Sequence, residues 1–212
     1  MTPLPLVLAM AALSLVPFLL LMLTCYVRIS VVLSILRGAI GASQVPPTAV
    51  LTGLSLVLTV AIMAPTAERM YRAGGADLTN PGSMPALLTA ADRAKEPLRD
   101  WMLKHTPARE RATFHALAVK ARPPEERASV SDRDLAVVVP AFVTSELRRA
   151  FEIGFLLFVP FLVIDMVVAN LLLALGMHML SPTTVSLPFK LLLFVLADGW
   201  QLVVRGLMES YL

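Results

Sequence analysis

The sequence predicts an all-α protein of the integral membrane type, made of long kinked helical hairpins with a small charged helical region between them. Two observations support this. First, 57% of the 212 residues are hydrophobic, more than a soluble domain needs to fill its core. Second, 26 of the 33 charged side chains lie between Glu68 and Glu152, so more than half of the chain carries only seven. No alternating apolar and polar pattern of any length predicts a strand.

Residues 1–67 are expected to form an N-terminal hydrophobic helical hairpin. The run from Leu4 to Val27 has no ionisable side chain and is long enough to cross a hydrocarbon layer of roughly 30 Å as a helix. A cleaved signal peptide is the alternative, but its positive charge precedes the apolar run, whereas Arg28 and Arg37 follow it. A second uncharged run, 38–67, returns the chain, so the positive-inside tendency places the N-terminus outside the cytoplasm.

Residues 68–150 are then expected to be an extracytoplasmic, periplasmic region of small amphipathic helices. Pro123 and Pro124 are expected to end one of these helices, and Ser131 with Asp134 resembles a helix start. Two sets of apolar residues recur at helical spacing: Leu87, Ala91, Ala94, Leu98 and Trp101, and then Phe114, Leu117 and Ala118. The charges of this region alternate in sign, which is typical of a solvated surface and not of a nucleic-acid interface.

The sequence contains no arrangement that predicts an enzyme or a cofactor. His105 and His115 are ten residues apart with no cysteine nearby, which does not fit a metal site. The single cysteine, Cys25, lies in an apolar run and has no partner for an internal disulfide. No glycine-rich phosphate loop and no nucleophile motif occurs. We therefore expect no catalytic residues, no metal and no cofactor.

Residues 151–212 are expected to form a C-terminal hydrophobic hairpin that reverses at the loop 176–182. Its first apolar run, Ile153 to Leu175, contains Pro160 and Asp165. Its second run, Val185 to Leu207, contains Pro188, Lys190, Asp198 and Arg205. Proline kinks a helix, and a charge at bilayer depth costs at least about 2.5 kcal/mol on insertion scales. These helices are therefore expected to pack against protein or line a cavity.

The charges of this hairpin are best explained as buried structural charges. Asp165 and Asp198 could also meet as an acid pair, but nothing around them resembles a substrate pocket. Lys190 needs a carboxylate if it is dry, and Glu146 of another subunit is a candidate.

The loop reads GMHMLSP and places Met177, His178 and Met179 at the reversal. Methionine is often only a gap filler, yet at such a turn flexible thioethers could close around objects of variable shape.

Two blocks resemble the FliP/SctR family of export-gate proteins in flagellar and type III secretion systems. They run from RISVVLSILRG to VAIMAP and from VPAFVTSELRRAFEIGF to GLMESY, and the strings SLPFKLLLF and DGW are specific. The resemblance implies an assembly of about five copies with S-type and T-type export-gate subunits. This helical cone lies in the bacterial inner membrane with a substantial part on the periplasmic side, contacts lipid near its base, and conducts unfolded secreted proteins.

The resemblance also assigns roles to residues. The family's methionine gasket around the pore maps onto Met177, His178 and Met179, where His178 departs from the usual methionine. An inter-subunit salt bridge of the family maps onto Glu146 and Lys190. The leading hypothesis is thus a pore-forming export-gate subunit, with a mild preference for an injectisome.

The alternative is a small-solute or ion-coupled transporter that uses Asp165, Lys190 and Asp198 as a relay. A scaffolding membrane protein is a third possibility. A further hypothesis is that protonation of His178 loosens the ring.

Overall fold

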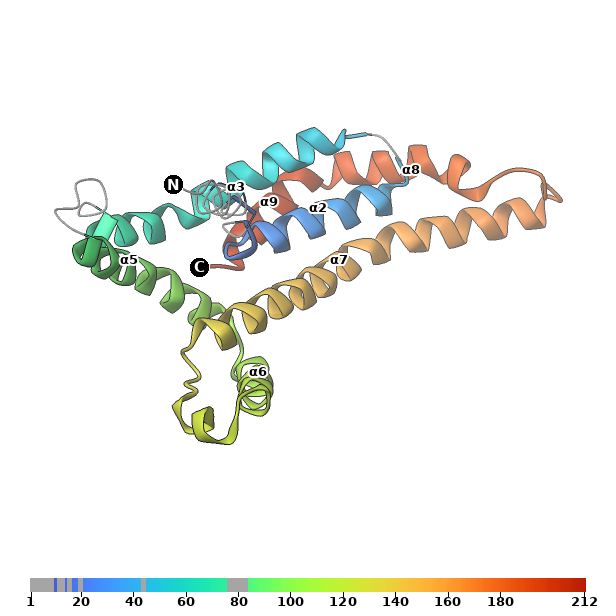
Figure 1. Ribbon diagram of the computed structural model, residues 1–212. Coiled ribbons are helices and arrows are strands. Elements are labelled where there is room, and N and C mark those ends of the chain that lie inside the picture. The colour runs from blue at the N-terminus through green and yellow to red at the C-terminus, as the bar shows by residue number, and fades with distance from the viewer. Residues whose placement is uncertain (1–9, 11–13, 15–16, 19–20, 43–44, 76–83) are drawn as a thin grey trace. The chain divides into compact units, whose positions relative to one another are not determined.

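The computed structural model describes residues 10, 14, 17–18, 21–42, 45–75 and 84–212 (Figure 1). Their regular structure is helical, and no strand occurs in these ranges, which confirms the all-α prediction. The predicted helix from Leu4 to Val27 lies largely outside the described residues. The elements are α2 (Tyr26–Ile40), α3 (Thr48–Met70), η1 (Tyr71–Gly75), α5 (Met84–His105), α6 (Ala108–Ala121), η2 (Pro124–Ser129), α7 (Leu135–Ala174), α8 (Pro182–Leu196) and α9 (Gly199–Glu209).

The chain divides into two compact units, which are described separately. Unit one contains residues 1–27 and 61–146, and unit two contains residues 28–60 and 147–212. The helices α3 and α7 therefore contribute residues to both units. These units group residues by packing, whereas the sequence regions 1–67, 68–150 and 151–212 concern placement about a membrane, and they stay a prediction.

Unit one has its core on α5 and the start of α7. The Trp101 ring meets Phe142 edge-on, with centroids 5.2 Å apart, and lies 4.8 Å from the His105 ring. Buried apolar residues of these two segments are Ala90, Ala94, Leu98, Trp101, Met102, Val137, Val138, Ala141 and Phe142. The predicted apolar face of α5 is confirmed at Ala94, Leu98 and Trp101. It is wrong at Ala91, which is exposed because the buried stripe passes through Ala90 instead.

The η1 turn of unit one is a π-helical segment that continues α3 and packs closely on α5. Gly74 is buried there, and a Cβ built on it would collide with the backbone carbonyl oxygen of Ala90. The absence of a side chain at Gly74 is therefore what allows the backbones of η1 and α5 to approach each other.

Helix α6 has no buried residue, so its predicted apolar face does not form part of the core. Leu117, for example, is 54% exposed. The helix is held by a contact of His115 Nε2 with the carbonyl oxygen of Val130 at 3.1 Å and by the ion pair of Arg111 with Asp132 at 3.7 Å. As predicted, Pro123 follows the end of this helix.

The predicted helix start at Ser131 and Asp134 is confirmed by reciprocal hydrogen bonds. The backbone N–H of Ser131 donates to Asp134 Oδ2 at 3.0 Å, and the N–H of Arg133 donates to Ser131 Oγ at 3.2 Å. Helix α7 begins at Leu135, directly after these residues. This is the arrangement of a capping box with aspartate in place of glutamate.

Unit two contains α2, the first part of α3, most of α7, and α8 and α9. Helix α7 has 40 residues, or about 60 Å at 1.5 Å per residue. It therefore starts 18 residues before the predicted apolar run at Ile153, and it continues through Pro160 without a break in its secondary structure. Gly154 of this helix faces Ile35 of α2 across a close contact. The prediction placed the start too late because it equated the end of the charged block with the start of a helix.

The predicted run from Val185 to Leu207 is two helices, α8 and α9, bent by 61°. The break lies at Ala197 and Asp198, where Asp198 has the left-handed conformation with φ 50° and ψ 47°. Pro188 was expected to disturb the helix, but it lies inside continuous α8.

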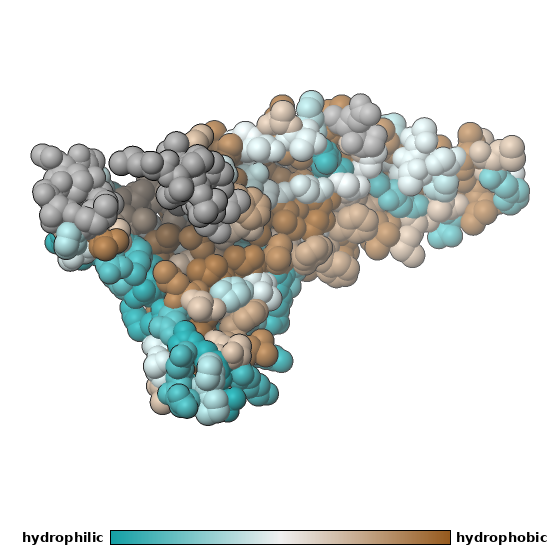
Figure 2. Space-filling view, in the orientation of Figure 1, coloured by the Kyte–Doolittle hydropathy of each residue, from teal (hydrophilic) through white to brown (hydrophobic). Residues whose placement is uncertain are grey.

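By length and composition, two helices could cross a membrane, Thr48–Gly74 and Leu135–Ala174, or three if the bent pair α8 and α9 is one span. Figure 2 shows the matching surface pattern. Hydrophobic residues gather over the helices of unit two, and hydrophilic residues cover α5 and α6. The coarse prediction of a membrane-type helical protein is thus confirmed.

Candidate functional site

The candidate site is the hairpin formed by α7 and α8, together with the loop at its tip. Helix α7 ends because Gly176 adopts a positive φ of 73°, a conformation that suits glycine. The N–H of Met177 donates to the carbonyl of Leu172 at 2.9 Å, and the N–H of Gly176 donates to the carbonyl of Leu173 at 3.1 Å. This pair of bonds is a Schellman motif, which satisfies the last carbonyls of the helix and fixes the direction in which Met177 leaves it.

The three predicted gasket residues lie at this tip and face outward. Met179 is 99% exposed and Met177 is 43% exposed, and His178 is also exposed. After them, Ser181 precedes Pro182, the first residue of α8, where proline is well tolerated because its missing N–H would be unpaired in any case. The loop is therefore a short projection between two firm helix ends.

A polar cluster ties the two arms of the hairpin to each other below the tip. Lys190 Nζ of α8 lies 2.6 Å from Asp165 Oδ2 of α7, and Ser186 Oγ donates a hydrogen bond to the other carboxylate oxygen, Oδ1. Lys190 is 3% exposed and Ser186 is fully buried. Both oxygens of the Asp165 carboxylate are thus engaged by α8.

The Lys190 ammonium also reaches a third helix of the same unit. It donates to the carbonyl oxygen of Ala39 at 3.1 Å, in the last turn of α2. Gly41 follows with a φ of 83° and leaves room for Nζ, which lies 3.7 Å from the place where its Cβ would be. A cation at this position satisfies an open carbonyl and matches the negative end of the helix dipole.

The structure therefore gives Lys190 a partner that the sequence analysis did not identify. Asp165 and Lys190 lie 12 residues before Met177 and 12 residues after His178, so a hairpin centred on the Met177–His178 peptide brings them together. Glu146 is fully buried on α7, in unit one. Its pairing with Lys190 of another subunit is a property of an assembly and stays a prediction.

Asp198 occupies a different environment from Asp165. It is exposed in this chain, so its burial would require a neighbouring subunit and also stays a prediction. It lies eight residues beyond Lys190, roughly 12 Å along a helix. A three-residue relay of Asp165, Lys190 and Asp198, as the transporter alternative requires, is therefore not assembled in this chain.

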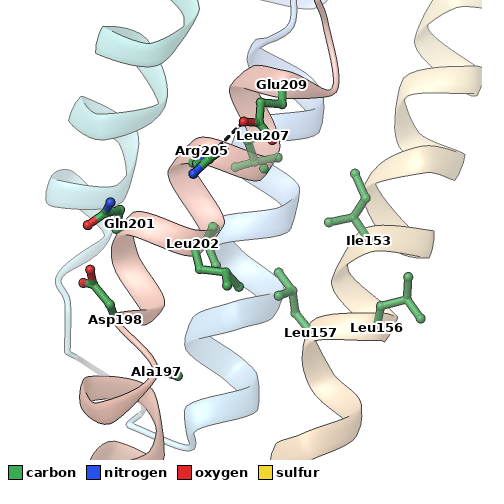
Figure 3. Close-up of a pocket in the computed structure, with 12 residues that line it drawn as sticks. Ile153, Leu156, Leu157, Ala197, Asp198, Gln201, Leu202, Arg205, Leu207 and Glu209 are labelled. Atoms are coloured by element: carbon green, nitrogen blue, oxygen red, sulfur yellow. Dashed lines mark hydrogen bonds and ion pairs between the residues drawn. The ribbon is translucent and has the colours of Figure 1, made fainter.

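Asp198 lies instead at the edge of a groove of about 600 Å³ that is lined by residues of α7 and α9 and by the break before α9 (Figure 3). Ile153 and Leu157 come from α7, and Leu202 comes from α9. Arg205 and Glu209 form an exposed ion pair at 2.7 Å on the rim. Among the residues that the structure describes, no group of three or more His, Cys, Asp or Glu side chains could hold a metal ion.

Known proteins place this hairpin in a family. Residues 9–207 match the model of the FliP family. The chain belongs to the FliP family. The FliP-family relatives include the "Hypersensitivity response secretion protein HrcR" of Ralstonia nicotianae, which is 45% identical, with 94% of this chain and 93% of the relative covered.

Two further relatives come from other organisms. The "Flagellar biosynthetic protein FliP" of Caulobacter vibrioides is 49% identical, with 95% of this chain and 74% of the relative covered. The "Yop proteins translocation protein R" of Yersinia pestis is 41% identical, with 97% and 95% covered. Because both secretion and flagellar proteins occur at similar identity, these values do not favour either class for this FliP-family chain.

Proposed function

We propose that this chain is a pore-forming subunit of a type III secretion or flagellar export gate in the bacterial inner membrane. Membership of the FliP family and the names of its relatives support a role in the export apparatus. About five copies, with S-type and T-type subunits, would surround a path for unfolded proteins and contact lipid on the outside. The reaction is transport, with no covalent chemistry.

The observation that carries the proposal is the tip of the α7–α8 hairpin. Met177 and Met179 project from a loop whose two ends are fixed by the Schellman motif and by the start of α8. Several copies of such a loop around an axis would form a ring of deformable apolar side chains. A hydrophobic constriction excludes water and ions by dewetting, and flexible thioethers can yield to an extended chain.

The double variant Met177→Ala and Met179→Ala tests this role. We expect it to assemble normally and to raise the leak of small ions in cells that express the complete export gate. Met166→Ala is the matched control, because Met166 is also an exposed methionine, at 58%, but lies in the body of α7. A leak equal to that of the control in an assembled complex would contradict the gasket.

The proposed bridge between Glu146 and Lys190 of neighbouring copies has its own test. Lys190 already has Asp165 and Ala39 as partners, so a second carboxylate would place two negative charges on one ammonium. We expect Glu146→Lys and Lys190→Glu each to reduce the amount of oligomer and the double reversal to recover part of it. If Lys190 serves only its own chain, the double reversal recovers none.

A further inference from the structure

The contact between the arms of the α7–α8 hairpin is largely apolar. Towards the tip, a groove of about 470 Å³ separates them, and its lining is entirely apolar. It is lined by Val163, Ile164, Val167, Val168, Leu171, Leu172, Leu175, Val185 and Phe189. The two arms are therefore not closely packed over this length, and hydrophobic contact alone is non-directional.

Directional contacts between the arms come from one carboxylate. In the described part of the hairpin, the side-chain hydrogen bonds that join α7 to α8 are those of Asp165 with Ser186 and Lys190. Ser186 and Lys190 are four residues apart, close to one turn, and so lie on the same face of α8. Two fixed points on one face define both the rotation of α8 about its axis and its position along α7.

We propose that Asp165 is a positioning residue that sets the register of α8 against α7 and thereby the height and direction of Met177–Met179. A slip of α8 by one turn would leave apolar side chains against apolar side chains. It would, however, separate Lys190 from Asp165 and from the α2 carbonyl of Ala39. An unpaired ammonium at 3% exposure is strongly unfavourable, so the cluster rejects every register but one.

The register itself follows from contacts within the chain. Only its consequence for the pore rests on the proposed function. The two are therefore measured separately, by a distance within the hairpin and by ion leak.

The distance is measured between spin labels on Leu173→Cys and Leu192→Cys, two exposed positions on α7 and α8, in the full chain with Cys25→Ala. Three variants are compared with this parent: Asp165→Asn, Ser186→Ala, and the double variant Asp165→Leu with Lys190→Met. The last replaces a buried ion pair by apolar side chains, which often preserves stability. Glu209→Gln is the control, since it breaks the exposed pair with Arg205.

In the parent and in Glu209→Gln we expect one narrow distance. In the apolar double variant we expect a melting temperature close to that of the parent together with a second population displaced by one helical turn, about 5 Å. Asp165→Asn is expected to show the same second population with lower stability, and Ser186→Ala a smaller one. A merely structural pair predicts the opposite for the double variant, a restored single distance.

A single narrow distance in the apolar double variant, or in Ser186→Ala if the double variant does not fold, overturns the proposal. Ion leak gives the second readout. A displaced distance with increased leak supports both the register role and the gasket. A displaced distance with no increase in leak supports the register role and contradicts the gasket.

Discussion

Gly154 offers the sharpest test of the packing in unit two. It lies on α7, and a Cβ built on it would collide with Ile35 Cδ1 of α2 and would lie 3.0 Å from Cγ2 and 3.1 Å from Cβ of the same side chain. Rotation about χ2 moves only Cδ1. Because isoleucine is restricted at χ1, Cγ2 and Cβ can move away only if a helix shifts. Gly154→Ala is therefore expected to strain the contact of α7 with α2.

The size of the effect follows from two opposing contributions. Alanine in place of glycine stabilises a helix interior by about 1 kcal/mol. Overpacking a well-filled contact destabilises by about 1–3 kcal/mol, and the upper part of that range applies where two of the three crowded atoms are fixed. The net loss is then about 1–2 kcal/mol. For a chain of this length, each kcal/mol corresponds to roughly 2–4 °C in Tm, so Tm should fall by about 2–8 °C.

The assay is thermal unfolding of the purified full chain, followed by tryptophan fluorescence. Gly53→Ala is the matched control, because Gly53 lies inside α3 and no atom lies within 4 Å of its built Cβ. This control has the helix-forming gain without the collision, so its Tm should rise by about 2–4 °C. The two alanine substitutions are thus expected to have opposite signs.

A rise in Tm for Gly154→Ala as large as that for Gly53→Ala would refute the reasoning. A rescue experiment gives a second check. In an Ile35→Ala background the crowded Cγ2 and Cδ1 are absent, so Gly154→Ala should no longer lower Tm. Persistence of the loss in that background would mean that the strain arises from another neighbour.

Three further predictions follow. Gly74→Ala should prevent the approach of η1 to α5, because the colliding atom is a backbone oxygen of Ala90; a Tm equal to that of the parent would contradict the close contact. Asp198→Val should lower Tm by an amount equivalent to about 1–2 kcal/mol, because a β-branched residue resists the left-handed conformation, while Asp198→Gly should be tolerated. If protonation of His178 loosens the ring, the ion leak of the parent should increase towards acidic pH while that of His178→Met stays flat; identical profiles from pH 5.5 to 8 would remove this hypothesis.

The sequence predicted the helical class and the reversal at residues 176–182 because both depend on local signals. Hydrophobic runs mark helices, and Gly176 followed by Pro182 marks the end of one helix and the start of another. The reciprocal cap of Ser131 and Asp134 is also a local signal, and it was recognised correctly.

The bend at Asp198 was missed although a signal was present. Aspartate followed by glycine is a turn signal, and Asp198 precedes Gly199. The prolines drew attention instead, yet Pro188 lies inside a continuous helix. A proline removes one backbone hydrogen bond, whereas a residue at positive φ redirects the chain. The conformation at Asp198 is therefore the better predictor of where the helix breaks.

The partner of Lys190 depends on tertiary structure and could not be deduced from residue type. Asp165, Asp198 and Glu146 are all acids that a lysine could meet. Centring the hairpin on the Met177–His178 peptide selects Asp165, but the choice of centre requires knowing that α7 ends at Ala174. The contact with Ala39 requires the position of a third helix, which no local pattern encodes.

The length of α7 bears on how this hairpin can meet a membrane. About 60 Å of helix is twice the roughly 30 Å of a hydrocarbon layer. The first 18 residues contain the four charges Glu146, Arg148, Arg149 and Glu152, whereas residues 153–174 contain only Asp165, which is paired with Lys190. Those 22 residues span about 33 Å. The boundary near residue 151 is therefore a change of environment within one helix, and a single continuous rod links the charged part of the chain to the tip that carries Met177.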